Sequence, residues 1–245
     1  MSRRIGQILF SGGLDSTTLA CLAKTECNDL AAISLDYGQR HRRELDAASS
    51  IAAHLGLDHR VLDVRSYGAL AAHSALTDAA QFGLPEERRE DEMSEDIPIT
   101  YVPLRNTFFL TLAAAHLESR VLAAIETDGA APESIDPVLY IAANALDYSG
   151  YPDCRPEFYA TATETLRLGS KIGTQYDLPM RIATPLIDKT KADIVRLAVD
   201  LDAPLHLTWS CYSAGPDPCG VCDSCILRAK GFAEAGVADP ALANR

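Results

Sequence analysis

Short apolar stretches alternate with longer segments of helical periodicity along the first two thirds of the chain. In residues 42–55, apolar side chains fall on one helical face: Leu45, Ala48, Ile51, Ala52 and Leu55. Similar patterns predict helices at residues 14–24, 106–126, 157–171 and 194–201. The apolar stretches predict strands at residues 8–10, 31–36, 60–64, 138–143 and, as a last or edge strand, 181–183. Strands separated by helices predict an α/β fold of Rossmann type, an open parallel sheet with helices on both faces.

Local signals mark where several of these elements begin and end. Gly56 is expected to end the helix before it, and Pro156 is expected to open another helix. Thr190 and Asp193 have the spacing of a capping box. Asn106 is expected to cap the helix that follows it.

Composition and charge narrow the class of protein. The chain has 245 residues, enough for one large domain or two small ones. We expect one domain over residues 1–205 and a smaller C-terminal segment over residues 206–245, whose roles depend on the motifs described below. The net charge is −12 and the pI is near 4.9, whereas proteins that bind long nucleic acids usually carry a basic face. We therefore expect no nucleic-acid partner.

Two further expectations come from hydropathy and from the loops. No apolar run approaches the roughly 20 residues of a membrane helix, and the N-terminus lacks the pattern of a secretion signal. We therefore expect a cytoplasmic protein without membrane contact. The acidic residues 86–96 predict a solvated surface loop, with an active-site lid as the alternative. Residues 128–137 also predict a surface loop.

A small-residue turn follows the first expected strand and leads into the first expected helix. It reads Ser11-Gly12-Gly13-Leu14-Asp15-Ser16. Such a turn leaves N–H groups free at a helix N-terminus, where they and the helix dipole bind an anion. Gly12 and Gly13 lack a Cβ, so a phosphate could approach the backbone closely. Asp15 fits an anion site only if a divalent cation such as Mg²⁺ lies between it and the phosphates. The alternative is an ordinary turn before a helix.

The loop differs from the two commonest nucleotide-binding motifs. It contains neither G-x-x-x-x-G-K-[ST] nor G-x-G-x-x-G, so it is not a Walker loop or a dinucleotide fingerprint. Its S-G-G-x-D-S pattern resembles the loop of the PP-loop ATP pyrophosphatase superfamily.

Polar residues also follow the other expected strands, where open parallel sheets bind ligands. His41 could meet ATP phosphates or simply belong to a charged helix start. Arg105 carries a fork of donors that suits phosphate or carboxylate. The densest cluster of polar residues lies within residues 144–158. The alternative is a long turn with tyrosines in the core, but this would leave the carboxylates of the cluster unexplained. We select from it candidates for a flat, hydrogen-bonding ligand: Asp147, Tyr148, Asp153, Arg155 and Phe158.

Four cysteines near the C-terminus form the metal signal. They are Cys211, Cys219, Cys222 and Cys225, the last three at C-x2-C-x2-C spacing. Four thiolates satisfy a tetrahedral ion, so we expect structural Zn²⁺ with no open coordination position. An iron–sulfur cluster is the alternative. The odd total of seven cysteines does not suggest a disulfide framework.

These motifs together resemble the 7-cyano-7-deazaguanine synthase (QueC) family. The matching segments are 10–20 (FSGGLDSTTLA), 36–42 (DYGQRHR), 101–106 (YVPLRN), 145–158 (ALDYSGYPDCRPEF), 184–195 (TPLIDKTKADIV) and 208–228 (TWSCYSAGPDPCGVCDSCILR). The resemblance runs almost end to end. It departs from the family pattern in the length of the 128–137 loop and the charge of residues 86–96, neither of which touches a motif.

The resemblance implies a reaction and a set of roles. ATP activates the carboxylate of 7-carboxy-7-deazaguanine, ammonia gives an amide, and a second activation leaves the nitrile, preQ0. The expected ATP-binding residues are Phe10, Ser11, Gly12, Gly13, Leu14, Asp15, Ser16 and His41. The expected catalytic residues are Asp15, Ser16, Arg105 and Lys191, with ATP, Mg²⁺ and Zn²⁺ as cofactors. The family also implies a homodimer.

Three alternatives stay open at this point. A related ligase could pass the activated acid to an amine other than ammonia. A PP-loop tRNA-modifying enzyme is disfavoured by the acidic charge, and a zinc-ribbon binding module without catalysis is disfavoured by the intact Ser11–Ser16 loop.

Overall fold

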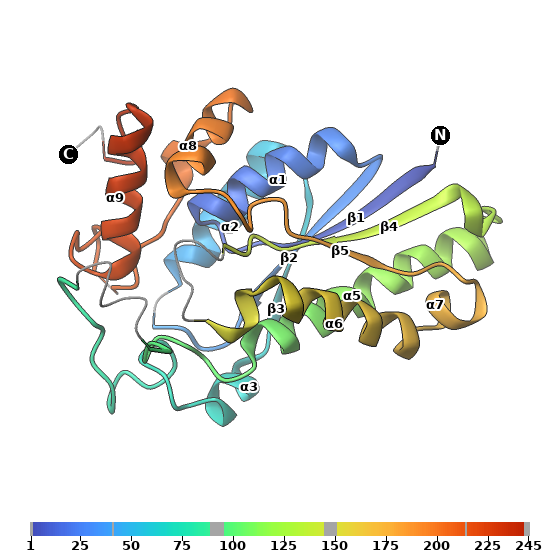
Figure 1. Ribbon diagram of the computed structural model, residues 1–245, viewed down its shortest axis with the longest axis horizontal. Helices are drawn as coiled ribbons and strands as arrows, with labels where there is room; N and C mark the ends of the chain where they lie inside the picture. Colours follow the sequence, from blue (N-terminus) through green and yellow to red (C-terminus); the bar gives the residue numbers. More distant parts are fainter. Residues whose placement is uncertain (1, 41, 89–95, 145–150, 214, 243–245) are drawn as a thin grey trace.

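A five-stranded parallel sheet forms the centre of the computed structural model, in the order β3-β2-β1-β4-β5 (Figure 1). The structure describes residues 2–40, 42–88, 96–144, 151–213 and 215–242. The strands are β1 (Arg3–Leu9), β2 (Asp29–Asp36), β3 (Asp58–Asp63), β4 (Ile135–Tyr140) and β5 (Arg181–Ala183). In register, Ile8 of β1 pairs with Ala32 of β2 and Tyr140 of β4. The predicted parallel α/β fold is confirmed.

Helices cover both faces of the sheet. In Figure 1, α1 (Leu14–Glu26), α2 (Arg43–Leu55) and α8 (Lys191–Asp200) lie on one face. The other face carries α5 (Arg105–Leu122), α6 (Pro156–Gly169) and α7 (Lys171–Gln175). The short α3 (Arg65–Leu70) follows β3, and α9 (Asp223–Ala235) packs against α8. Single turns of other helix types are η1 (Ala123–Thr127), η2 (Pro132–Ser134), η3 (Pro152–Cys154) and η4 (Leu205–Leu207).

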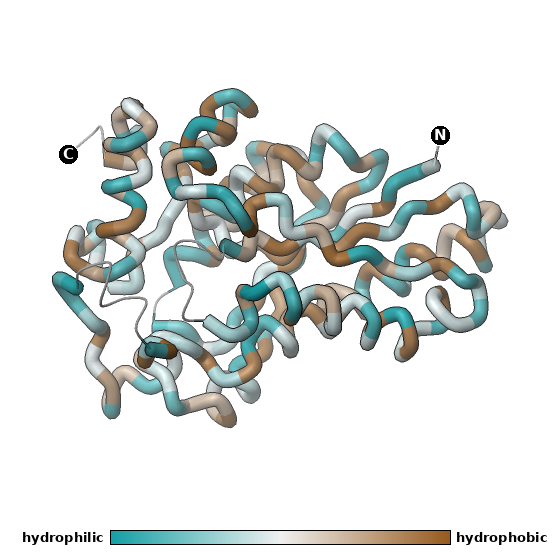
Figure 2. The backbone as a smooth tube through the Cα atoms, in the orientation of Figure 1, coloured by the Kyte–Doolittle hydropathy of each residue, from teal (hydrophilic) through white to brown (hydrophobic). Residues whose placement is uncertain are grey.

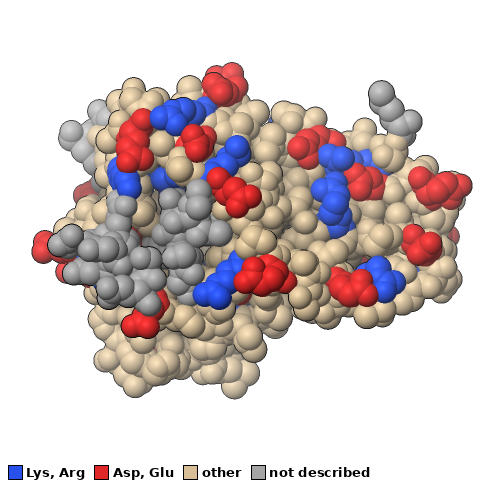
Figure 3. All heavy atoms as spheres, viewed as in Figure 1, with Lys and Arg blue, Asp and Glu red and all other residues tan. Residues whose placement is uncertain are grey.

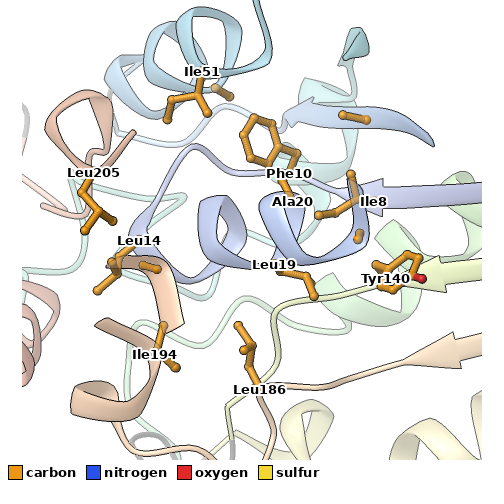
Figure 4. Close-up of a cluster of buried hydrophobic side chains, with 14 of the residues drawn as sticks. Ile8, Phe10, Leu14, Leu19, Ala20, Ile51, Tyr140, Leu186, Ile194 and Leu205 are labelled. Carbon is orange, nitrogen blue, oxygen red and sulfur yellow. The ribbon is translucent and has the colours of Figure 1, made fainter. Parts of the chain in front are cut away.

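Alternate side chains of β1 belong to two different hydrophobic cores. Ile8 lies in the cluster with α1, α2 and α8 that Figure 4 shows, whereas Ile5 and Leu9 lie in the cluster with α5. Successive side chains of a strand point to opposite faces, so a strand covered on both faces is apolar throughout. Figure 2 shows hydrophobic residues gathered where helices meet the sheet.

Several predicted boundaries are confirmed. Gly56 ends α2 with φ 66°, in the left-handed region. The Thr190 side chain accepts from the Asp193 N–H, and the Asp193 side chain accepts from the Thr190 N–H, which completes the capping box.

Other boundary predictions are wrong. The loop expected at residues 128–137 ends early, because β4 already begins at Ile135 to pair with β1. The helix expected at residues 157–171 ends at Gly169, and the Ser170 side chain caps the separate α7. The helices α3 and α9 were not predicted.

Asn106 does not cap a helix. The helix α5 begins one residue earlier, at Arg105, after Leu104 with φ 56°. The amide Nδ2 of Asn106 instead donates to the Asp153 carbonyl at 3.2 Å, and its backbone N–H donates to the Asp153 carboxylate at 3.3 Å. Asn106 therefore ties the start of α5 to the 152–154 turn.

One helix is long and apolar enough, by length and composition alone, to cross a membrane: Arg105–Thr127. Charged residues interrupt its apolar sequence, so it contains no uninterrupted apolar run of membrane length. It packs on β1 and β4 as a core helix.

The first residues of the 86–96 segment contact the C-terminal segment: Glu87 N–H donates to Val221 O at 2.9 Å, and Arg88 pairs with Asp223. Residues 89–95 lie outside the described part of the chain.

Candidate functional site

The Ser11–Ser16 loop joins β1 to α1 at the carboxyl edge of the sheet. The Ser16 hydroxyl lies 3.0 Å from the Ser11 hydroxyl and donates to the Gly13 carbonyl at 3.2 Å. Gly13 caps α1 without a side-chain hydrogen bond. The N–H groups of the first turn therefore keep their donors for a ligand, as an anion site at a helix N-terminus requires.

A cavity of about 330 Å³ opens above this loop. The loop contributes most of its residues to the wall: Phe10, Ser11, Gly13, Leu14, Asp15 and Ser16. Arg105 from α5 and Lys191 from α8 complete the set of expected catalytic residues at the same wall. The structure thus brings together the four expected catalytic residues, which come from three separate motifs.

Gly12 is the loop residue that does not line the cavity. Its φ is 77°, and a Cβ there would lie 2.4 Å from the Ala48 nitrogen and 2.7 Å from the Glu44 carbonyl oxygen. A glycine is therefore required here for a reason that the sequence did not give: it lets the loop pack against the backbone of α2. Close approach of a phosphate to Gly12 stays a prediction.

Asp15 and Lys191 form an ion pair at the cavity wall. The Lys191 Nζ lies 3.0 Å from Oδ1 and 2.8 Å from Oδ2 of Asp15. The two side chains are 13% and 24% exposed, so solvent screens the pair only in part. Lys191 compensates the negative charge that looked out of place in an anion-binding loop.

The four C-terminal cysteines converge. Their sulfur atoms all lie within 4.8 Å of one another. Backbone N–H groups of Ser213 and Cys219 donate to Cys211 Sγ at 3.3 and 3.2 Å. Hydrogen bonds from the neighbouring thiols and from this backbone hold the pKa of Cys211 well below its usual range. Four such sulfurs fit one tetrahedral metal ion.

The cysteine segment is joined directly to the Ser11–Ser16 loop. The Trp209 N–H donates to the Gly12 carbonyl at 3.0 Å. From α9, Ser224, Leu227 and Arg228 line the cavity. Arg228 is fixed there by Asp239, whose carboxylate oxygens lie 2.6 and 2.9 Å from its Nε and Nη2. The metal-binding segment is therefore one wall of the site.

Comparison with known proteins identifies the family. The model of the queuosine biosynthesis protein QueC matches residues 7–236. The chain belongs to the QueC family. It is 46% identical to a 7-cyano-7-deazaguanine synthase of Trichodesmium erythraeum, over 96% of this chain and 98% of that protein. It is 45% identical to a 7-cyano-7-deazaguanine synthase of Thermoplasma acidophilum, over 98% and 92%. Among solved structures, a U34-tRNA thiolase of Methanococcus maripaludis has a TM-score of 0.41 and 18% identity, covering 95% of this chain and 64% of that one.

The residues expected to bind the deazaguanine differ in their burial, and those that the structure describes lie outside the cavity wall. Arg155 is exposed at the start of α6, and Phe158 packs edge-on against Tyr159 in the core. Asp153 is buried against Asn106, and burial raises the pKa of its carboxyl. None of these three residues lines the cavity, although their neighbours Tyr151 and Cys154 do. Asp147, Tyr148 and the expected ATP ligand His41 lie outside the described residues.

The QueC cavity also contains an acid that the motifs did not single out. Glu44, from the first turn of α2, lines the wall, and burial raises the pKa of its carboxyl to about 7 against the opposing effect of Arg105. Burial lowers the pKa of Arg105, but Tyr37, Tyr151 and Asp153 raise it by a larger amount. The guanidinium therefore stays charged. In the sequence, Glu44 is indistinguishable from an ordinary acid that complements a helix dipole.

Proposed function

We propose that this chain is a 7-cyano-7-deazaguanine synthase, an ATP-dependent C–N ligase that acts on 7-carboxy-7-deazaguanine and ammonia. The family match and the names of the relatives support the product class. The observation that carries the proposal is the cavity that joins the Ser11–Ser16 loop to Lys191 and Arg105.

The chemistry follows from the poor reactivity of a carboxylate. Its oxygen is a poor leaving group, so it is first joined to a phosphorus atom of ATP, which releases ADP if the γ-phosphorus is attacked or pyrophosphate if the α-phosphorus is attacked. Ammonia then attacks the carbonyl carbon, the C–N bond forms, and the phosphorus-bound oxygen leaves with its electron pair. In a second activation the amide oxygen is transferred to phosphorus in the same way. Its departure, with loss of two protons from nitrogen, gives the nitrile.

We assign the residues by what they can donate. The Ser11–Ser16 loop, Ser16 included, binds ATP phosphates through its N–H and hydroxyl groups. Arg105 and Lys191 neutralise charge that develops on phosphorus oxygens, which is the main contribution an enzyme makes to such a transfer. Asp15 is the residue that would hold Mg²⁺, with Lys191 released to the phosphates. Asp147, Tyr148, Asp153, Arg155 and Phe158 remain proposals for the deazaguanine.

The four thiolates are proposed to hold Zn²⁺ in a closed, structural site. Among the described residues on the face that Figure 3 shows, Lys and Arg lie beside Asp and Glu and form no separate basic patch, which supports a small-molecule substrate over tRNA. A homodimer is proposed from the family resemblance alone, whereas a cytoplasmic location and the division at residue 205 are proposed from the sequence pattern.

One incubation tests the reaction. The protein is mixed with ATP, ammonium and the carboxylic acid, and the nitrile is sought by mass spectrometry, while AMP or ADP shows which phosphorus atom is attacked. We expect Asp15→Ala to abolish product, and Asp153→Ala to raise the concentration of acid required. If the amide of a different added amine accumulates and no nitrile forms, the chain is a ligase with another acceptor. If no nucleotide is consumed, the proposal fails.

A further inference from the structure

A third arginine, besides Arg105 and Arg228, lines the cavity from the segment between β2 and α2. Arg40 lines the wall and is anchored at its tip: Nη2 donates to the Phe82 carbonyl at 2.9 Å and lies 3.4 Å from the Ala79 carbonyl. These acceptors belong to the loop after α3, so the guanidinium is held between two loops. Its plane is fixed before any ligand binds.

The Nε of Arg40 is an orphan donor. It is shielded from solvent, and no described residue accepts its proton. Nearly all buried N–H groups in proteins are hydrogen-bonded, and an unmet donor on a charged group is costly. A donor held in this state beside a cavity is satisfied when a ligand supplies the acceptor.

The charge of Arg40 is equally uncompensated. The other cations of the wall have acidic neighbours: Lys191 pairs with Asp15, Arg228 pairs with Asp239, and Asp153 acts on Arg105. No ion pair links Arg40 to an acid among the described residues. Of the cations lining the cavity, Arg40 is therefore the one whose positive charge is left for a ligand.

We propose that Arg40 Nε donates to an anionic oxygen of a substrate bound in this cavity. The inference rests on the proposed function only in that the substrates are anions. Both of them, the carboxylic acid and ATP, carry such an oxygen, and a guanidinium suits carboxylate and phosphate alike. Arg40 belongs to the motif DYGQRHR, in which only His41 was singled out from the sequence.

Binding measurements on the full chain separate the two ligands. Calorimetry with a non-hydrolysable ATP analogue alone and with the acid alone is performed on Arg40→Met, which removes the donors but keeps the stem. Arg42→Met is the matched control, because Arg42 is exposed and does not line the cavity. We expect Arg40→Met to raise the Kd of one ligand about 10- to 100-fold, and the ligand affected is the one that Arg40 contacts.

A measurement on the unaltered protein keeps the test independent of folding. The ¹⁵Nε–H resonance of Arg40, assigned by its loss in Arg40→Lys, should move and exchange more slowly with solvent when that ligand is added. Unchanged Kd values for both ligands, or an Nε–H signal that neither ligand moves, would overturn the proposal. A protein that binds through Arg40 but makes no nitrile would refute the proposed reaction and leave this inference standing.

Discussion

The fit between α9 and Lys191 allows a sharp test of how the metal-binding segment serves catalysis. Gly231 lies inside α9, where a Cβ would stand 2.3 Å from Cγ and 2.9 Å from Cβ of Lys191. Carbon atoms normally approach to about 3.5–4.0 Å. The substitution Gly231→Ala therefore requires the Lys191 stem or α9 to move by more than about 1 Å.

The consequences for stability and for catalysis differ in size. Overpacking costs about 1–3 kcal/mol, whereas alanine in place of glycine within a helix returns about 1 kcal/mol. The free energy of unfolding should thus fall by only about 0–2 kcal/mol. A displacement of about 1 Å in a group that positions reacting atoms can cost about 100-fold in rate. We therefore expect kcat to fall by one to two orders of magnitude, about 10- to 100-fold, in a folded protein.

The assay combines steady-state kinetics with urea unfolding and a Mg²⁺ titration. Because Lys191 pairs with Asp15, displacing it should also change the Mg²⁺ concentration required for half-maximal rate. Gly169→Ala is the matched control, since Gly169 ends α6 and nothing lies within 4 Å of its added Cβ. A Gly231→Ala protein with the kcat and Mg²⁺ requirement of the unaltered chain would show that α9 does not position Lys191.

Three other substitutions or treatments give distinct outcomes. Gly12→Ala should destabilise the fold by more than about 2 kcal/mol, because it combines a left-handed φ with overlap against Ala48; urea unfolding measures this, with Gly83→Ala as control. Removing the metal with a chelator should make four more thiols titratable and lower nucleotide affinity, because the segment that begins at Trp209 holds the Gly12 carbonyl; unchanged affinity in the metal-free chain would contradict the link. The pKa of Glu44 is raised to about 7 from its usual 4.5, so the folded state holds this proton more tightly. Its contribution to stability is present below pH 4.5 and is lost as the pH rises through 7. Glu44→Gln should therefore stabilise the protein at pH 8 relative to pH 5 by up to about 3 kcal/mol, and equal effects at both pH values would refute the buried placement of Glu44.

The sequence predicted the elements whose signals are local. Alternating apolar stretches, the left-handed Gly56 and the capping box at Thr190 each act within a few residues, and each is found in the structure. The helix α9 was missed for the same reason. Its start lies among the metal-binding cysteines, and Gly231 weakens the helical pattern in its middle. Only the packing of that glycine against Lys191 explains its presence.

The site was predictable where topology alone brings residues together. Residues that follow parallel strands meet at one edge of the sheet, which is why Asp15, after β1, and Asn144, after β4, share a cavity. The contacts of Asn106 with Asp153 and of Gly12 with α2 depend on tertiary packing. For these residues, local rules predicted a helix cap and an approach to phosphate, and the first prediction is wrong.

Lys191 shows what kind of local conflict points to a functional residue. It occupies the first position of α8, directly after the cap Thr190, where the positive end of the helix dipole disfavours a cation. Asp15, in the first turn of α1, is favoured by the dipole of its own helix but would repel the phosphates that the loop is proposed to bind. Each residue taken alone violates one electrostatic preference, and pairing them at 2.8 Å relieves both while no ligand is bound. Under the proposed function, a triphosphate bound with a divalent cation would give each of the two side chains a stronger partner, so the pair would exchange partners on binding. A position where a local rule fails without compensation nearby in the sequence is where function should be sought.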